Sequence, residues 1–328
     1  MWTGVRLGPD GFAKPVAVKS LLPAFVRSAP HVRAFLHEAR TASHVQHRSV
    51  VQIRELLLED DRYWLSMELV RGWSLRRLLG AVHAAGRPIP LEVAIALARE
   101  VAAGLHAIHE SGLIHRHVAP ENIMVSTSGH VVVLDFGCAD WQLAQQVRFT
   151  PPLVELAPAY ASPQMIAGER LDARTDLYSL GALLHELVFG VPPSPAPTAR
   201  SPHRDDVPMA LDDLIARSLD RDPAARFSSA REIEMVLELI SFRHGWPVTS
   251  SYVGAYLDEV FLRSASPQVP PWPSAPPRPP PAPRPRSLAE LDRFATAEPA
   301  PLPTIAPRAP SELEKTRVRL RRRPTRGR

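Results

Sequence analysis

Near the middle of the chain, a polar loop reads His115-Arg116-His117-Val118-Ala119-Pro120-Glu121-Asn122. It follows Leu91–Ser111, a long stretch with helical periodicity. It precedes two short apolar runs, Ile123–Val125 and Val131–Leu134, which flank the turn-forming residues Thr127-Ser128-Gly129. Apolar runs on both sides of such a turn are typical of a β-hairpin. The polar loop therefore connects a helix to a hairpin.

Extended and helical patterns are distributed unevenly around this loop. Alternating apolar runs come early, with one helical stretch among them at roughly His31–Val45; the runs are Thr3–Leu7, Pro15–Lys19, Val51–Leu58 and Arg62–Met67. Helical periodicity dominates later, at Leu75–Ala84, Leu91–Ser111, Thr175–Val188, Met209–Leu219 and Ala230–Ile240. A strand-rich part followed by a helix-rich part predicts an α+β fold with two lobes.

Three further motifs keep a fixed order around the loop. Val16-Ala17-Val18-Lys19 closes a predicted strand, Asp135-Phe136-Gly137 follows the hairpin, and Asp176-Leu177-Tyr178-Ser179-Leu180-Gly181 opens a helix. Together with the loop, these motifs resemble the Ser/Thr protein kinase family, of the branch common in bacteria, over about residues 1–243. The resemblance implies a small β-rich N-lobe at residues 1–68 and a helical C-lobe at residues 71–243.

The resemblance also implies a nucleotide site. Lys19 would hold the α- and β-phosphates of ATP, and Glu38 would fix Lys19 by an ion pair. Ser66-Met67-Glu68-Leu69-Val70 resembles the hinge that presents backbone groups to adenine, although a plain core strand is the ordinary alternative. The expected nucleotide-binding residues are Ala17, Lys19, Glu38, Met67, Glu68 and Val70.

Other residues take metal-binding or structural roles by the same resemblance. Asn122 and Asp135 are hard oxygen ligands where the family holds Mg²⁺ against the phosphates. Asp176 would accept backbone N–H bonds from the loop. The residues with an expected structural role are His115, Phe136, Asp176 and Arg226.

One structural pair is altered. Gln164 replaces the glutamate that would form a salt bridge with Arg226 in the family. An amide oxygen can still accept a hydrogen bond from a guanidinium group.

Three catalytic positions depart from the family, whose loop reads His-Arg-Asp-Leu-Lys-Pro-Glu-Asn. His117 stands at the catalytic aspartate, Ala119 at the loop lysine, and Ala157 at the activation-segment threonine. Loss of the lysine alone should cost roughly 2–4 kcal/mol of transition-state stabilisation. A mostly neutral His117 could in principle accept a proton, but positioning and charge stabilisation dominate phosphoryl transfer. We expect catalysis to be impaired.

The N-terminus also departs from the family. A glycine-rich loop should precede Thr3–Leu7, but Met1-Trp2 leave no room for it. Gly4, Gly8 and Gly11 have the wrong spacing and belong to a hairpin. We expect the first strand and the phosphate cover to be missing: either the protein begins upstream of Met1, or the fold tolerates an incomplete sheet.

The end of the chain differs in composition from the rest. Residues 266–328 hold 17 of the 36 prolines and 13 Lys/Arg against 5 Asp/Glu, so they account for the net charge of +5. We expect a disordered Pro/Arg-rich tail there, serving either as a solubilising end or as a tether to an anionic polymer or lipid. Residues 244–265 are expected to form a helical extension, which packs on the C-lobe or binds a partner.

The composition favours a cytoplasmic protein. The single cysteine, Cys138, excludes an intramolecular disulfide, and no signal peptide opens the chain. The most apolar helical stretch, Leu180–Val191, contains His185 and Glu186 and is too short and polar to cross a bilayer.

From these observations we expect a Ser/Thr protein kinase-like protein that is a catalytically impaired pseudokinase. It would act on other proteins as a regulatory or binding module and keep weak binding of ATP and Mg²⁺. The alternative is an active Ser/Thr protein kinase with a mis-assigned start and an atypical catalytic loop. The sequence names neither substrate, partner, pathway nor oligomeric state.

Overall fold

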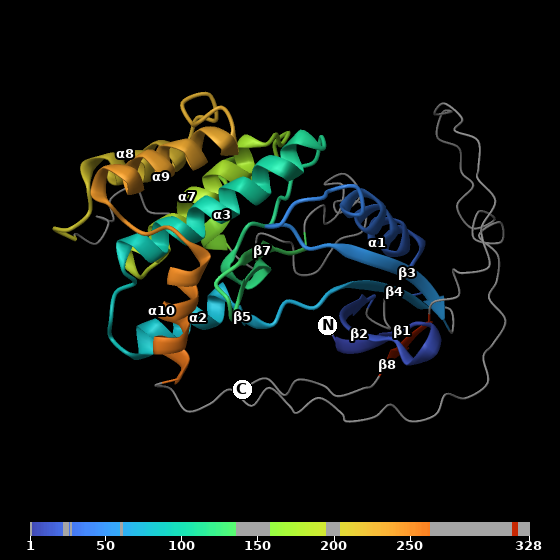
Figure 1. Ribbon diagram of the computed structural model, residues 1–328. Helices are drawn as coiled ribbons and strands as arrows, with labels where there is room; N and C mark the ends of the chain where they lie inside the picture. Colours follow the sequence, from blue (N-terminus) through green and yellow to red (C-terminus); the bar gives the residue numbers. More distant parts are fainter. Residues whose placement is uncertain are drawn as a thin grey trace. The chain divides into compact units, whose positions relative to one another are not determined.

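The computed structural model describes residues 2–21, 26, 28–59, 62–135, 158–194, 204–262 and 317–320. All of them belong to one compact unit, which comprises Met1–Ala265 and Arg317–Arg328. Within this unit an antiparallel sheet precedes a helical part (Figure 1). The prediction of an α+β fold with two lobes is confirmed.

The N-lobe is built on an antiparallel sheet. Its strands lie in the order β3 (Ile53–Glu59), β4 (Arg62–Glu68), β2 (Ala13–Ser20), β1 (Trp2–Leu7) and β8 (Arg317–Leu320). β1 and β2 form the hairpin predicted around Gly8–Gly11. β4 pairs with β2 and with β3. The helix α1 (Ala29–Ala42) buries residues at helical spacing, namely Phe35, Ala39 and Ala42.

The outer edge of β1 is paired with a strand from the end of the chain. β8 (Arg317–Leu320) runs antiparallel to β1, with Leu320 opposite Gly4 and Arg317 opposite Leu7. The proline-rich composition predicts disorder for residues 266–328, but these four alternate charged and apolar side chains, which is the period of a strand. The other residues of the expected tail lie outside the described ones.

The C-lobe core is centred on the apolar helix α3 (Leu91–Glu110), which packs against α7 (Arg174–Phe189) and α9 (Ala230–His244) (Figure 1). Because α3 is apolar over most of its circumference, helices can cover several of its sides. The remaining helical elements are α2 (Leu75–Ala84), η2 (Pro120–Asn122), η3 (Pro158–Tyr160), α6 (Pro163–Ala167) and α8 (Met209–Ser218). A second sheet, β5 (Gly72–Ser74), β6 (Ile123–Ser126) and β7 (Val131–Val133), contains the predicted hairpin.

The predicted helical extension is α10 (Ser250–Leu262), which lies against α2 and α3 (Figure 1). The Phe261 ring stacks on the Trp73 ring with centroids 4.2 Å apart. The helix also touches the turn of the β6–β7 hairpin so closely that a Cβ on Gly129 would lie 1.8 Å from the carbonyl oxygen of Ser250. The helix packs on the C-lobe here, and binding of a partner by the same segment stays a prediction.

None of the helices in the described part of the chain combines the length and the apolar character needed to span a membrane.

Candidate functional site

The expected hinge is the end of β4 together with the two residues after it. In the ladder of β2 and β4, Ala17 lies opposite Met67 and Val16 lies opposite Glu68. The two strands that carry expected nucleotide-binding residues are therefore neighbours. Met67 is only 2% exposed and Ala17 is also buried, whereas Glu68 and Val70 are half-buried. The ladder therefore brings Ala17 and Met67 together in the core.

Lys19 and Asp135 form an ion pair, with Lys19 Nζ 3.1 Å from Asp135 Oδ1. Lys19 comes from the end of β2 and Asp135 from the residues after β7, so the pair joins the two lobes. Asp135 has a positive φ of 53°, a left-handed conformation that is uncommon outside glycine. Glu38 lies in α1, but its side chain is outside the described residues, so its expected pairing with Lys19 stays a prediction.

The polar loop is fixed by the buried carboxylate of Asp176, at the start of α7. Its oxygens accept hydrogen bonds from the backbone N–H groups of His115 (2.8 Å) and Arg116 (2.7 Å) and from His109 Nε2 (2.7 Å). Burial would raise the pKa of Asp176, but the bond from His109 and the other donors lower it below its usual value. The carboxylate therefore stays charged and holds Arg116 in its left-handed conformation, with φ 66°.

His115 links the loop to the end of the β6–β7 hairpin through both ring nitrogens. Its Nε2 donates to the carbonyl oxygen of Leu134 at 3.0 Å, and its Nδ1 accepts from the backbone N–H of His117 at 3.1 Å. Burial lowers the pKa of His115 to about 4, so the imidazole is neutral near pH 7. A neutral ring with one donor and one acceptor satisfies both contacts and joins the loop to the strand that leads to Asp135.

His117 and Asn122 bind one another directly. The Nδ2 amide nitrogen of Asn122 donates to the carbonyl oxygen of His117 and to His117 Nδ1, each at 2.9 Å. The carbonyl can only accept, so it fixes the amide orientation, and His117 Nδ1 must be an acceptor as well. The imidazole proton is consequently on Nε2, which is buried without a hydrogen-bond partner among the described residues. Burial also lowers the pKa of His117, which keeps the ring neutral.

Arg226 is buried at 3% exposure and holds three segments of the C-lobe. It donates from Nη2 to Gln164 Oε1 (2.7 Å), from Nη1 to the carbonyl of Arg174 (2.9 Å) and from Nε to the carbonyl of Asp220 (2.7 Å). The prediction that the amide of Gln164 can accept from this guanidinium is confirmed.

A network that the sequence did not reveal lies beside the loop. Arg76 of α2 donates to Tyr160 Oη (2.9 Å) and to the buried carboxylate of Glu186 (3.1 Å), and the Tyr160 hydroxyl donates to Glu186. Arg76 also lies 3.4 Å from Glu121 of the loop. Burial and the bond to Glu186 raise the pKa of Tyr160. The network ties the loop and η3 to α2 and α7, and no local motif marks Arg76 or Glu186, which join these distant segments.

Several predicted residues lack a structural account. Phe136 and Ala157 lie outside the described residues, while Ala119 is buried next to η2. Among the described residues, no group of three or more His, Cys, Asp or Glu side chains could hold a metal ion. The expected role of Asn122 and Asp135 as Mg²⁺ ligands therefore stays a prediction.

Comparison with known proteins gives a consistent result. The family model described as protein kinase domain matches residues 10–238. Among curated relatives, the probable serine/threonine-protein kinase CPE1738 of Clostridium perfringens is 35% identical over 270 residues, which is 78% of this chain and 38% of that protein. The serine/threonine-protein kinase PknL of Mycobacterium tuberculosis is 32% identical over 242 residues, covering 70% of this chain and 59% of that protein. The chain therefore spans less than two thirds of the length of either relative.

A solved structure shows the same fold. The crystal structure of the Mycobacterium tuberculosis PknI kinase domain aligns with a TM-score of 0.56 and 26% identity, over 70% of this chain and 87% of that domain. The two-lobed arrangement expected from the motifs is therefore confirmed.

Proposed function

Because this chain belongs to the protein kinase family, with the Ser/Thr kinases of bacteria among its relatives, we propose that it is a pseudokinase: a kinase-like protein in which phosphoryl transfer is impaired and which regulates or binds other proteins. The proposal rests chiefly on the contact between Asn122 and His117. A cytoplasmic location remains a prediction from the sequence.

The contact removes the function of a general base from the loop. A base must offer a lone pair to the substrate hydroxyl, within hydrogen-bond reach of its proton. In His117 the Nδ1 lone pair is taken by the Asn122 amide, and Nε2 carries the proton. The imidazole at the aspartate position therefore has no free lone pair and does not accept the proton of a hydroxyl group.

Charge stabilisation is lost at the neighbouring position. Ala119 is fully buried and supplies no cation, so the loop lacks the ammonium group that the family places near the transferring phosphoryl group. Because phosphoryl transfer depends mainly on positioning and electrostatic stabilisation, losing a fixed donor of this kind costs roughly 10²–10³ in rate.

Nucleotide binding is a separate property, and the remaining residues fit it. The Asn122 amide uses its nitrogen for His117, which leaves Oδ1 for a metal, and Leu134, next to Asp135, donates its backbone N–H to the carbonyl of Asn122 at 2.8 Å. Lys19 adds a cation at the same place. Bound Mg²⁺–ATP would bring the phosphoryl group; these residues would bind its charges without activating a hydroxyl.

The test measures transfer and binding on the same preparations. Purified protein should transfer no labelled γ-phosphate to itself or to a general protein substrate above an Asp135→Ala control. The double variant His117→Asp/Ala119→Lys restores two of the three altered catalytic positions and shows whether transfer returns with them. Transfer by the unaltered protein that Asp135→Ala abolishes would overturn the proposal and establish the alternative, an active Ser/Thr kinase.

Binding is followed by thermal unfolding. ATP with Mg²⁺ in millimolar excess should raise the unfolding midpoint by a degree or more, because a ligand that binds only the native state stabilises it by mass action. Lys19→Ala should remove the shift. No shift at any concentration would show that the pocket no longer binds nucleotide, while leaving the result of the transfer assay unaffected.

A further inference from the structure

The loop after α1, residues 47–51, is held between the two lobes. Its Val51 N–H donates to the carbonyl of Val133 (3.0 Å), and the N–H of Val133 donates to the carbonyl of Ser49 (2.9 Å). On its other side the loop touches α3 at Gly104, where a Cβ would lie 2.8 Å from the Ser49 carbonyl oxygen. The loop therefore contacts both β7 and α3 through its backbone.

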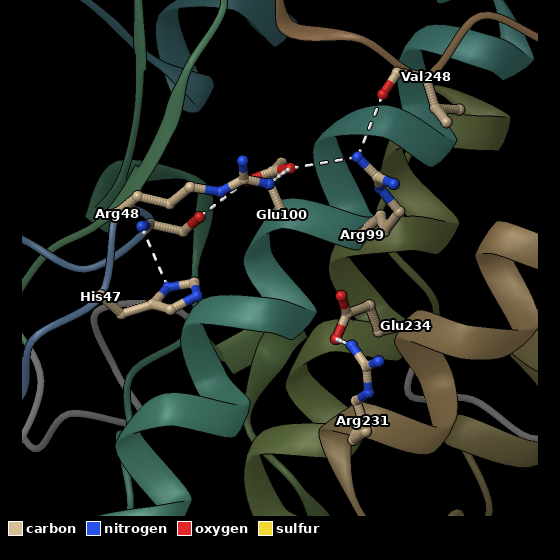
Figure 2. Close-up of polar contacts among 8 residues, drawn as sticks. His47, Arg48, Arg99, Glu100, Arg231, Glu234 and Val248 are labelled. Atoms are coloured by element: carbon tan, nitrogen blue, oxygen red, sulfur yellow. Dashed lines mark hydrogen bonds and ion pairs between the residues drawn. The ribbon is translucent and has the colours of Figure 1, made fainter.

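The carboxylate of Glu100, on α3, fixes the side chains of this loop. It accepts from Arg48 Nη2 at 2.7 Å and from Ser49 Oγ at 2.8 Å (Figure 2). Its side chain is 18% exposed, so these bonds are only partly screened by water. Glu100 thus adds two side-chain bonds to the backbone contacts of the loop.

A third donor connects Glu100 to the C-terminal extension. Arg99 Nη2 donates to Glu100 Oε1 at 3.3 Å and to the carbonyl oxygen of Val248 at 3.2 Å (Figure 2). Val248 lies two residues before α10, so a single guanidinium nitrogen contacts both the carboxylate that holds the loop and the segment that leads into α10.

At its other end the loop reaches the hinge. The backbone N–H of Glu68 donates to the carbonyl of Gln52 at 3.0 Å, and Glu68 Oε1 accepts from the N–H of Gln52 at 3.3 Å. The side chain of Gln52 donates back to the carbonyl of His47 at 3.3 Å. Contacts therefore run without a break from the α10 segment through Arg99 and Glu100 to the loop and the hinge.

We propose that Arg99 and Glu100 couple the C-terminal extension to the junction of the lobes, so that docked α10 restricts the motion of the loop at residues 47–51. Arg99 and Arg48 both form ion pairs with Glu100, whose carboxylate is the counter-ion that keeps these two cations close. If the Val248 segment moves away, Arg99 loses a partner, Glu100 is held less firmly, and the loop gains freedom. A molecule that displaces α10 would then loosen the hinge. This inference depends on the fold and on these contacts, and it holds whether or not the protein transfers phosphate.

Hydrogen exchange of the full chain tests the coupling. Arg99→Met keeps the length of the side chain and removes the bridging donors. Exchange should therefore rise about 2- to 30-fold both in peptides covering residues 47–53 and in those covering 248–262, which corresponds to about 0.5–2 kcal/mol of coupling. Arg231→Met is the matched control: it removes the ion pair between Arg231 and Glu234 on α9 (Figure 2), and the Glu234 carboxylate influences His47 of the loop only through its charge. The bonds of Arg99 to Glu100 and to Val248 stay intact in this variant. It should leave both regions unchanged.

A second variant perturbs α10 from its far end. Phe261→Ala removes the ring stacked on Trp73 and should raise exchange at residues 47–53 when Arg99 is present, but add little in the Arg99→Met background. The proposal is overturned if Arg99→Met affects the loop no more than Arg231→Met does, or if Phe261→Ala changes the loop equally in both backgrounds. Should Arg99→Met fail to fold, Arg99→Leu replaces it with the same outcomes, since leucine has no donor for either acceptor.

Discussion

Replacing Asp176 by asparagine should destabilise the protein strongly, although the two side chains have nearly the same size. The carboxylate is fully buried and accepts from two backbone N–H groups and from His109. An asparagine keeps one oxygen but turns its amide hydrogens toward at least one of these donors. Hydrogen bonds to a charged partner contribute roughly 1.5–3 kcal/mol each, and a buried donor that loses its partner costs about 1–3 kcal/mol more. We expect a loss of about 3–5 kcal/mol from a total stability of roughly 5–15 kcal/mol.

Urea unfolding followed by circular dichroism at pH 7 measures this loss. With a slope of about 2.5 kcal/mol per molar urea, the midpoint should fall by roughly 1–2 M. Asp213→Asn is the matched control, since Asp213 is an exposed residue of α8 and its change should stay within about 0.5 kcal/mol. A loss for Asp176→Asn below about 1 kcal/mol would refute the reasoning that this carboxylate holds the loop.

Three further predictions concern pH, the extension helix and the tail. Burial lowers the pKa of His115 from 6.5 to about 4, so between these pH values the unfolded chain binds a proton that the folded chain does not. The free energy of unfolding should therefore fall by up to about 3 kcal/mol as the pH drops through this window. Urea unfolding at several pH values measures this dependence, which His115→Gln should flatten. Gly129→Ala should lower the free energy of unfolding by at least about 2 kcal/mol and expose α10 to proteolysis, because the added Cβ would overlap Ser250. Gly112→Ala is the control: Gly112 has a similar φ but open space around it, so its change should cost only the backbone strain of about 1–2 kcal/mol. Equal losses of stability in the two variants would contradict the close contact of Gly129 with α10. Deleting residues 312–328 should abolish any binding to heparin that weakens steeply with salt, as counter-ion release requires; binding that survives the deletion would exclude the tail as a tether.

Local patterns predicted the elements of this fold well. The hairpin around Gly8–Gly11, the helix of the extension and the β6–β7 hairpin each follow from a periodicity or a turn signal within about twenty residues, and such signals are set by nearby backbone geometry. The motif residues Asp176 and Arg226 are buried, and each forms hydrogen bonds to distant segments.

Contacts between distant segments were not predictable in the same way. His109 binds Asp176, which lies 67 positions away in the sequence, and Arg76 binds Glu186, which lies 110 positions away. In the sequence, His109 and Arg76 look like ordinary polar residues of amphipathic helices. The pairing of β8 with β1 is also hidden in the sequence, because an alternating four-residue segment fits many edges. The tautomer of His117 follows only from the direction in which the Asn122 amide points, which is a property of the folded loop.

The docking of α10 has a practical consequence for where this protein can be cut. The family match ends at residue 238, inside α9, which continues to His244. A fragment trimmed to that boundary would lose the last turn and a half of α9 and would uncover the ring of Trp73. Expression vectors and crystallisation trials should therefore keep the chain at least to Leu262, the last residue of α10.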